Sequence, residues 1–134
     1  MFRAATNLVG AAPCKVLIIE DNVDGRESMR TLLSMLGCQV ETAADGAEGV
    51  RKALALHPHI AFVDIGLPNM DGMEVAKQIR STLGRRIFLV ACTAYDKGYG
   101  GERTQEAQFD CWLVKPVALP DLLFWLRKAF AALN

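Results

Sequence analysis

The sequence has no excess of either charge, since 15 Lys and Arg residues balance 15 Asp and Glu residues. A surface that follows a phosphate backbone needs a basic excess, so we expect no nucleic-acid partner for this domain. The sequence also lacks any apolar run near the length of a membrane span, and we therefore expect no membrane association. No internal repeat or low-complexity tract is present. What remains is a single globular domain.

Cysteine pairs and cysteine–histidine clusters of the kind that bind zinc are also missing. The cysteines are Cys14, Cys38, Cys92 and Cys111. We interpret them as buried free thiols in a reducing cytoplasm and do not favour disulfide or zinc chemistry. The only histidines, His57 and His59, are expected at a helix end and in a loop rather than as metal ligands.

The length of 134 residues fits one domain with a core that needs no disulfide or metal to support it. A hydrophobic fraction of 51% indicates a folded rather than a disordered chain. Residues 1–13 carry one early positive charge, Arg3, and an apolar run interrupted by polar residues, which is unlike an export signal. We therefore expect an N-terminal tail or linker at 1–13 and one domain at 14–134.

Short apolar runs of strand length alternate with segments of helical spacing. The runs are residues 15–19, 39–43, 60–64, 87–91 and 111–114. The run at 60–64 is apolar on both faces, as expected of a central strand, whereas the run at 39–43 alternates like a strand at the sheet edge. This order predicts an α/β fold with a doubly wound, flavodoxin-like five-stranded parallel sheet, order 2-1-3-4-5.

Helices are expected between the strands. Their expected core-facing residues are Met29, Leu32, Leu33 and Leu36; Ala47, Val50 and Leu54; Val75, Ala76 and Ile79; and Leu119, Leu122, Leu123, Leu126, Phe130 and Leu133. Only residues 102–108 can form the fourth helix, because the glycines just before them cost about 1 kcal/mol each relative to alanine.

Polar side chains follow four of the predicted strands. Glu20 and Asp21 follow the first strand, Asp64 ends the third, and Thr93 and Lys115 follow the fourth and fifth. A parallel sheet brings these strand ends to one edge, where three carboxylates repel one another and one lysine cannot compensate. Mg²⁺ prefers such oxygen ligands, so the pattern predicts a magnesium site.

An acidic site that holds a cation can also support covalent chemistry. The Asp64 carboxylate would attack phosphorus and form an aspartyl phosphate, whose charge Lys115, the Thr93 hydroxyl and helix N-terminal amides would offset. Each residue alone has a simpler interpretation as a helix cap, a turn residue or a solvated charge. Their joint position at one sheet edge favours the site.

Four motifs carry a resemblance to a known family. They are Glu20-Asp21-Asn22, the run DIGLPNMDG at 64–72, Thr93-Ala94 and Lys115-Pro116. In order and spacing they resemble the response regulator receiver domain of two-component signalling, over nearly everything from Lys15 onward. The residues of the first two motifs are similar to those of receiver domains in hybrid histidine kinases.

The resemblance implies a role for each matching residue. Asp64 is the implied phosphoacceptor, and Glu20, Asp21, Asp64 and the Gly66 carbonyl are the implied Mg²⁺ ligands. Thr93, Lys115 and the Ala94 amide are the implied contacts of the phosphoryl group. The resemblance also implies a phosphohistidine donor, on a histidine kinase or a histidine phosphotransfer domain, and a Lys115–Pro116 bond that is often cis.

Two positions depart from the family pattern. The family pairs a threonine switch with a tyrosine or phenylalanine on the fifth strand, and here Trp112 matches that position. A larger indole resists burial in a close-packed interior, so Trp112 either stays outward as a contact residue or is an ordinary aromatic at the sheet edge. In the family, two positions control the attack of water on the acyl phosphate, and here they are Gly66 and Tyr95. Gly66 has no side chain to orient a water, and Tyr95 would shield the site, so we expect slow self-dephosphorylation.

Two surfaces are candidates for partner contact. Phe124 lies nearly opposite the leucine face of the last helix with Trp125 on its flank, and together with Trp112 they suggest an interface for dimerisation or a partner. The alternative is that residues 1–13 cover them. The phosphoryl donor is expected over the mouth of the site, with contacts from Asn22, Val23, Gly25, Arg26, Pro116 and Val117.

Three other functions fit the sequence less well. A phosphatase with an aspartate nucleophile would have a second acid two residues after Asp64, where Gly66 stands. A receiver fold that serves only as a phosphorylation-independent interaction module would have lost Asp64, Lys115 or an acidic partner. A flavin carrier would have a hydroxyl- and glycine-rich phosphate loop after the first strand, where the sequence is acidic. We therefore expect a phosphoacceptor domain that catalyses only its own phosphorylation and dephosphorylation.

Overall fold

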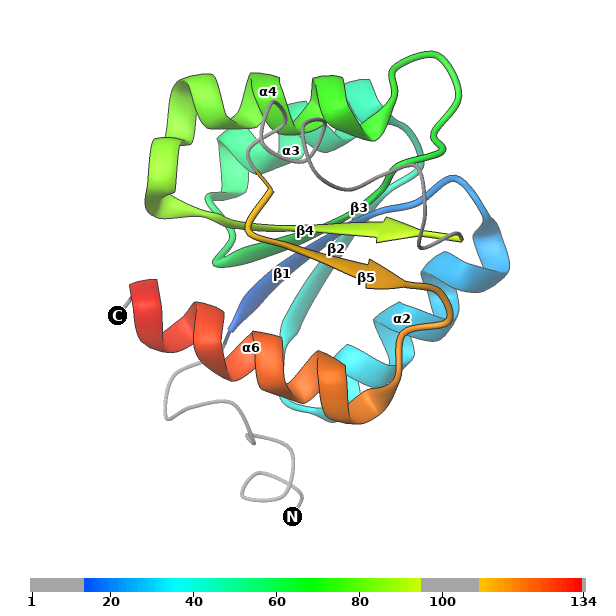
Figure 1. Ribbon diagram of the computed structural model, residues 1–134, viewed down its shortest axis with the longest axis vertical. Coiled ribbons are helices and arrows are strands. Elements are labelled where there is room, and N and C mark those ends of the chain that lie inside the picture. The colour runs from blue at the N-terminus through cyan, green and yellow to red at the C-terminus, as the bar shows by residue number, and fades with distance from the viewer. Residues whose placement is uncertain (1–13, 95–108, 134) are drawn as a thin grey trace.

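The computed structural model describes residues 14–94 and 109–133 (Figure 1). Its elements in chain order are β1 (Lys15–Ile19), α2 (Val23–Met35), β2 (Gln39–Ala43), α3 (Gly46–Leu56), β3 (Ile60–Asp64), α4 (Gly72–Leu83), the 3₁₀ helix η1 (Gly84–Arg86), β4 (Phe88–Thr93), β5 (Cys111–Val114) and α6 (Leu119–Leu133). The strands form one parallel five-stranded sheet in the order β2-β1-β3-β4-β5. The predicted fold class and strand order are confirmed. The short helix expected at 102–108 lies outside the described residues.

Strand β3 occupies the centre of the sheet, and every one of its residues is buried. It pairs with β1 on one side and with β4 on the other, so that Asp64 lies opposite Cys92. Strand β2 alternates between exposed and more buried residues, as expected at an edge. The sequence pattern therefore placed the central strand and the edge strand correctly.

Two hydrophobic clusters cover the two faces of the sheet. Helices α3 and α4 lie on one face of the sheet (Figure 1), where Val75, Ala76 and Ile79 are fully buried, as predicted. Helices α2 and α6 pack on the other, where Leu33 and Leu122 are fully buried. No helix in the described parts of the chain is long and apolar enough to cross a membrane.

Three helices begin at side chains that cap their first turn. Asn22 Oδ1 accepts a hydrogen bond from Gly25 N at 2.8 Å, and Asp45 Oδ1 accepts one from Glu48 N at 2.8 Å. Asp71 Oδ1 accepts the equivalent bond from Glu74 N at 3.0 Å. These caps satisfy amides that the helix leaves unpaired. Asn22 and Asp71 therefore fix the helix starts next to the acidic strand ends.

The buried side of α3 differs from the prediction. Ala47 is exposed, and Gly46, Gly49 and Ala53 face the sheet, with Val50 and Leu54 partly buried beside them. The helix lies so close to β1 that a Cβ on Gly49 would lie 2.5 Å from Ile19 Cδ1. The smallest residues face the sheet because the helix–sheet distance leaves no room for larger ones.

The first residue of α6 also differs from the prediction, since Leu119 is 43% exposed rather than buried. It begins the helix, before the turn at which Leu122 packs against the sheet. Leu122 and Leu126 are fully buried, as predicted, with Leu123 and Phe130 partly buried, whereas the side chain of Leu133 lies outside the described residues.

Candidate functional site

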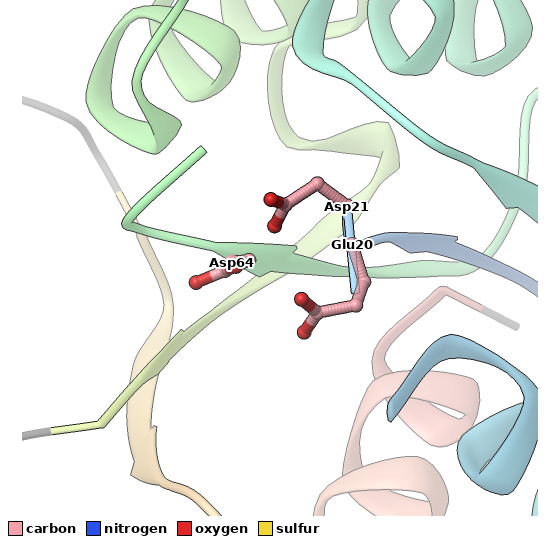
Figure 2. Close-up of side chains that lie close together, drawn as sticks. All are labelled: Glu20, Asp21 and Asp64. Carbon is pink, nitrogen blue, oxygen red and sulfur yellow. The ribbon is translucent and has the colours of Figure 1, made fainter. Parts of the chain in front are cut away.

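Three carboxylates meet at the carboxyl edge of the sheet. Glu20 and Asp21 directly follow β1, and Asp64 is the last residue of the neighbouring strand β3. One carboxylate oxygen of each lies within 4.8 Å of the other two (Figure 2). The structure thus brings together the three acids that the sequence analysis singled out.

Lys115 follows β5, the edge strand that β4 separates from β3, and its side chain extends to this cluster. Its Nζ lies 2.7 Å from Glu20 Oε1 and 3.5 Å from Asp64 Oδ1. The peptide bond between Lys115 and Pro116 is cis, as the resemblance implied. Glu20 and Asp64 are buried and Asp21 is exposed, so the cluster has a covered floor and an open side.

Burial and the neighbouring charges shift the pKa of both Glu20 and Lys115. Burial raises the pKa of Glu20, and the nearby Asp64 carboxylate raises it further, against hydrogen bonds from Lys115 and from the Asn22 amide. Burial alone would lower the pKa of Lys115, but the hydrogen bond to Glu20 and the attraction of Asp64 and Glu20 together raise it. Lys115 therefore stays charged and offsets only part of the negative charge.

The donor set fits a hard divalent cation. Three carboxylates and one ammonium carry a formal charge of minus two, which a divalent ion neutralises. The carboxylate oxygens are close enough together to share one ion, and oxygen donors with room for water ligands are what Mg²⁺ prefers. Sulfur and imidazole ligands do not contribute to the cluster.

The loop after β3 orients the Asp64 carboxylate. Its Oδ1 accepts a hydrogen bond from Gly66 N at 3.0 Å, and Gly66 itself is exposed. Ile65 is held on both sides, since its N–H donates to Cys92 O at 3.0 Å and its carbonyl accepts from Gly72 N at 3.3 Å. Gly66, an implied metal ligand through its carbonyl, thus lies beside Asp64.

Two residues that support the site were not singled out as such in the sequence. A Cβ on Gly72 would lie 2.8 Å from Asp64 O and 2.9 Å from Ile65 Cα, so only glycine allows α4 to start so close to the loop. Arg26 Nη1 donates to Glu20 O at 2.9 Å and holds the turn after β1. In the sequence, the Asp71-Gly72 pair indicates that a helix starts near Gly72. It does not indicate that this helix start lies against the loop after β3.

Thr93 ends β4 and Ala94 follows it, on the other side of β3 from β1 and Glu20. Thr93 is buried at the end of β4, and its carbonyl accepts a hydrogen bond from Lys115 N at 2.7 Å. Ala94 follows and is exposed. Tyr95, the other position expected to tune water access, lies outside the described residues.

A cleft of about 760 Å³ leads from the carboxylates into the space between α2 and α6. Its polar end contains Glu20, Asp64 and Lys115, and its apolar end contains Leu32 and Leu122, among other residues. Apolar clefts with a few convergent polar groups are the usual form of a binding site. The acidic cluster is therefore reachable from the outside.

The three aromatic residues expected to form one interface do not share a face of the sheet. Trp112 is half-buried, packs against the cluster under α3 and α4, and meets Phe109 edge-on at 5.6 Å between ring centroids. Trp125 belongs to the opposite cluster and stacks on Phe88 at 6.0 Å. Only Phe124, 55% exposed, points clearly into solvent. Side chains alternate across a strand, so Trp112 faces away from α6.

Comparison with known proteins agrees with this geometry. The family model of the response regulator receiver domain matches residues 16–127. The chain is 36% identical over 115 residues to the response regulator MprA of Mycolicibacterium vanbaalenii, covering 86% of this chain and 49% of that protein. The chain thus spans about half the length of the curated relatives it matches.

Solved structures show the same similarity. The receiver domain of the sensor histidine kinase PA1611 from Pseudomonas aeruginosa, which has magnesium in its active-site cleft, aligns with a TM-score of 0.82 at 29% identity, covering 90% of this chain and 99% of that one. The receiver domain of Ssk1 from Saccharomyces cerevisiae, crystallised with the histidine phosphotransfer protein Ypd1, aligns with a TM-score of 0.74 at 28% identity, covering 82% and 83%.

Sheet order, the acidic cluster at the carboxyl edge and the match over most of the chain all lead to one assignment. The chain belongs to the response regulator receiver domain family, whose members are phosphoacceptor domains of two-component signalling.

Proposed function

We propose that Asp64 receives a phosphoryl group from a phosphohistidine in a magnesium-dependent reaction. The observation that carries this proposal is the convergence of Asp64 with Glu20, Asp21 and Lys115 at one sheet edge. A buried carboxylate at a strand end, reachable through a cleft, is placed to act as a nucleophile.

Each residue near Asp64 has a distinct task in this reaction. An Asp64 oxygen attacks the phosphorus, a P–O bond forms, and the P–N bond to the donor imidazole breaks. Lys115 moves from its contact with Glu20 toward the new phosphoryl oxygens, while Thr93 and the Ala94 amide supply hydrogen bonds on the far side. Gly66 N already holds one Asp64 oxygen and so limits rotation of the carboxylate.

Glu20, Asp21, Asp64 and the Gly66 carbonyl would hold the cation. When bound, Mg²⁺ supplies the positive charge that a phosphoryl group next to three carboxylates requires. The Asn22 amide, 3.2 Å from Glu20 Oε2, and Arg26 keep Glu20 oriented toward the cluster.

The donor would be a histidine kinase or a histidine phosphotransfer domain that docks over the mouth of the cleft in the cytoplasm. The start of α2 and the Pro116–Val117 segment border this mouth, and Val23 there is 58% exposed. The Ssk1 relative, crystallised with a histidine phosphotransfer protein, supports this class of partner. Phe124, with Trp125 against it at 4.9 Å, is a second candidate contact for a partner or a second copy.

We further propose that the aspartyl phosphate is long-lived. Gly66 is exposed and offers no side chain to orient an attacking water. Loss of the phosphoryl group from purified protein within seconds would contradict this proposal.

A substitution of the phosphoacceptor tests the main proposal. Asp64→Asn should abolish transfer of radiolabelled phosphate from a phosphorylated histidine phosphotransfer domain, while Asp71→Asn, which keeps the helix cap, should retain it. Tryptophan fluorescence titrated with Mg²⁺ and then beryllofluoride should respond in the wild type and lose the beryllofluoride step in Asp64→Asn. Equal labelling of both variants, or indifference of the wild type to both ligands, would favour a phosphorylation-independent interaction module.

A further inference from the structure

The amino-terminal edge of the sheet, opposite the carboxylates, brings two cysteines together. Strands β1 and β2 pair from Lys15 and Gln39 onward, and Gln39 N donates to Cys14 O at 2.8 Å. The same register, continued by one residue, sets Cys14 beside Cys38. Neighbouring strands lie ~4.8 Å apart, within the range of about 4.4–6.8 Å between Cα atoms that a disulfide requires.

Both thiols enter the same hydrophobic cluster and contact each other. Cys14 is 1% exposed and Cys38 is 8% exposed, and their side chains are hydrogen-bonded to one another. Both are free thiols. No local sequence pattern links Cys14 to Cys38, because the two lie far apart in the chain.

We propose that Cys14 and Cys38 form a redox-active dithiol that a hydroperoxide converts into a disulfide. The proposal goes beyond the phosphoacceptor role and does not depend on it, since the two sites lie at opposite ends of the strands. It does not require an oxidising compartment, because a disulfide in a reducing one is transient and regulatory.

Cys38 reacts first. It is the more exposed thiol, and the hydrogen bond from Cys14 lowers the pKa of Cys38 and raises that of Cys14. The Cys38 thiolate attacks one peroxide oxygen, an S–O bond forms and the O–O bond breaks, and the leaving oxygen takes up the proton that Cys38 released and departs as water or an alcohol. Cys14 sulfur then attacks Cys38 sulfur, and the S–O bond breaks to release water that carries away the Cys14 proton. In sum, two thiols lose two electrons and two protons, and the peroxide is reduced.

The other cysteines are the matched controls. Cys92 is buried on β4, and burial raises its pKa to about 12. Cys111 is half-buried on β5, and burial raises its pKa to about 12. Neither has a second cysteine as its register partner, since Cys92 lies opposite Leu113 and Cys111 opposite Val90.

The test uses the full chain treated with hydrogen peroxide, alkylated without reduction and digested with trypsin. Cleavage after Arg3, Lys15, Arg30 and Arg51 places Cys14 and Cys38 in separate peptides, residues 4–15 and 31–51, that only a disulfide can join. We expect this joined pair in the wild type and in Cys92→Ser and Cys111→Ser, its loss in Cys14→Ser and Cys38→Ser, and its disappearance after dithiothreitol.

Three outcomes would overturn the proposal. The first is a stable sulfenic or sulfinic acid at Cys38 without the joined peptides. The others are joined peptides found only in disulfide-linked dimers, and joined peptides found only when the protein is oxidised in urea. Circular dichroism of each serine variant before treatment verifies its fold, and Cys38→Ala is a second variant in case Cys38→Ser unfolds. Transfer of a phosphoryl group to Asp64 is not used as a readout, so failure here leaves the proposed function untouched.

Discussion

The two faces of the sheet differ in how closely the helices pack and in whether a cleft remains. On the face covered by α3 and α4, glycine replaces larger residues where the helices approach, and a Cβ on Gly49 or Gly72 would lie under 3.0 Å from its neighbours. On the face covered by α2 and α6, a cleft of about 760 Å³ remains. The closely packed face supports the loop that follows Asp64, and the looser face leaves the cleft through which the proposed donor would reach it.

This difference follows from the residues that each face must accommodate. Glu20, Asp64 and Lys115 line the cleft on the looser face, where the proposed phosphoryl transfer would require side chains to exchange partners. Close-packed interiors resist such movement. Four predictions test the contrast, from the largest expected effect to the smallest.

The largest effect is expected at Arg80, a buried residue of α4 whose partner Asp110 is exposed. Arg80 Nη2 lies 2.5 Å from Asp110 Oδ2, and its Nη1 donates to the carbonyls of Gly84 and Ile87 at 2.6 Å. Arg80→Met should lower the free energy of unfolding by about 3 kcal/mol, because it leaves buried acceptors unpaired. Urea denaturation measures this value. The control is Arg85→Met, whose exposed contact to Asp110 at 3.4 Å should be worth less than about 1 kcal/mol.

The second effect is expected at Gly49. Gly49→Ala forces Ile19 to move and should cost about 2 kcal/mol by overpacking, offset by about 1 kcal/mol of helix propensity. The net result is a lower urea midpoint. A midpoint at or above that of the wild type would show that this face has room after all.

The third prediction is an increase in the free energy of unfolding. It makes the same glycine-to-alanine substitution on the face covered by α2 and α6. A Cβ on Gly25 in α2 would meet nothing closer than Asn22 Oδ1 at 3.5 Å, an ordinary contact. Gly25→Ala should therefore raise the free energy of unfolding by about 0.5–1 kcal/mol. Together with Gly49→Ala it forms a matched pair, and two changes of the same sign would remove the contrast between the faces.

The smallest effect is a pH dependence at the amino-terminal edge of the looser face. His59 Nδ1 accepts a hydrogen bond from Lys15 N at 3.0 Å, and its ring packs on Phe130 at 5.1 Å. Burial, and secondarily the Lys15 charge, lower the pKa of His59 below its usual 6.5. The unfolded chain therefore binds the proton more readily, so this part of the stability is complete above pH about 6.5 and is lost as the pH falls through the folded-state pKa.

The expected loss is below the net value of one hydrogen bond, about 1 kcal/mol. Urea midpoints between neutral and mildly acidic pH should fall less in His59→Asn than in the wild type. His57→Asn is the control, because Asn tolerates the left-handed backbone at φ 50°. If both variants keep the full pH dependence, other groups are responsible.

Features that depend on residues close together in the chain could be predicted from the sequence, whereas features that depend on the spacing of packed elements could not. The runs from Lys15 and Ile60, and the acids that follow them, predicted the sheet order and the edge where Glu20, Asp21 and Asp64 meet. The error at Ala47 came from a pattern that assumes large residues face the sheet, whereas the helix–sheet distance admits only small ones.

The sequence by itself determined the strand order, the central strand and the identity of the acidic cluster, because side-chain periodicity and parallel pairing are repeated in every such sheet. Only the tertiary structure decided that Trp112 and Trp125 belong to opposite faces, that Arg80 pairs with Asp110, and that Cys14 lies beside Cys38. These contacts join residues far apart in the chain, and their existence depends on the distances between packed elements, which no local pattern records.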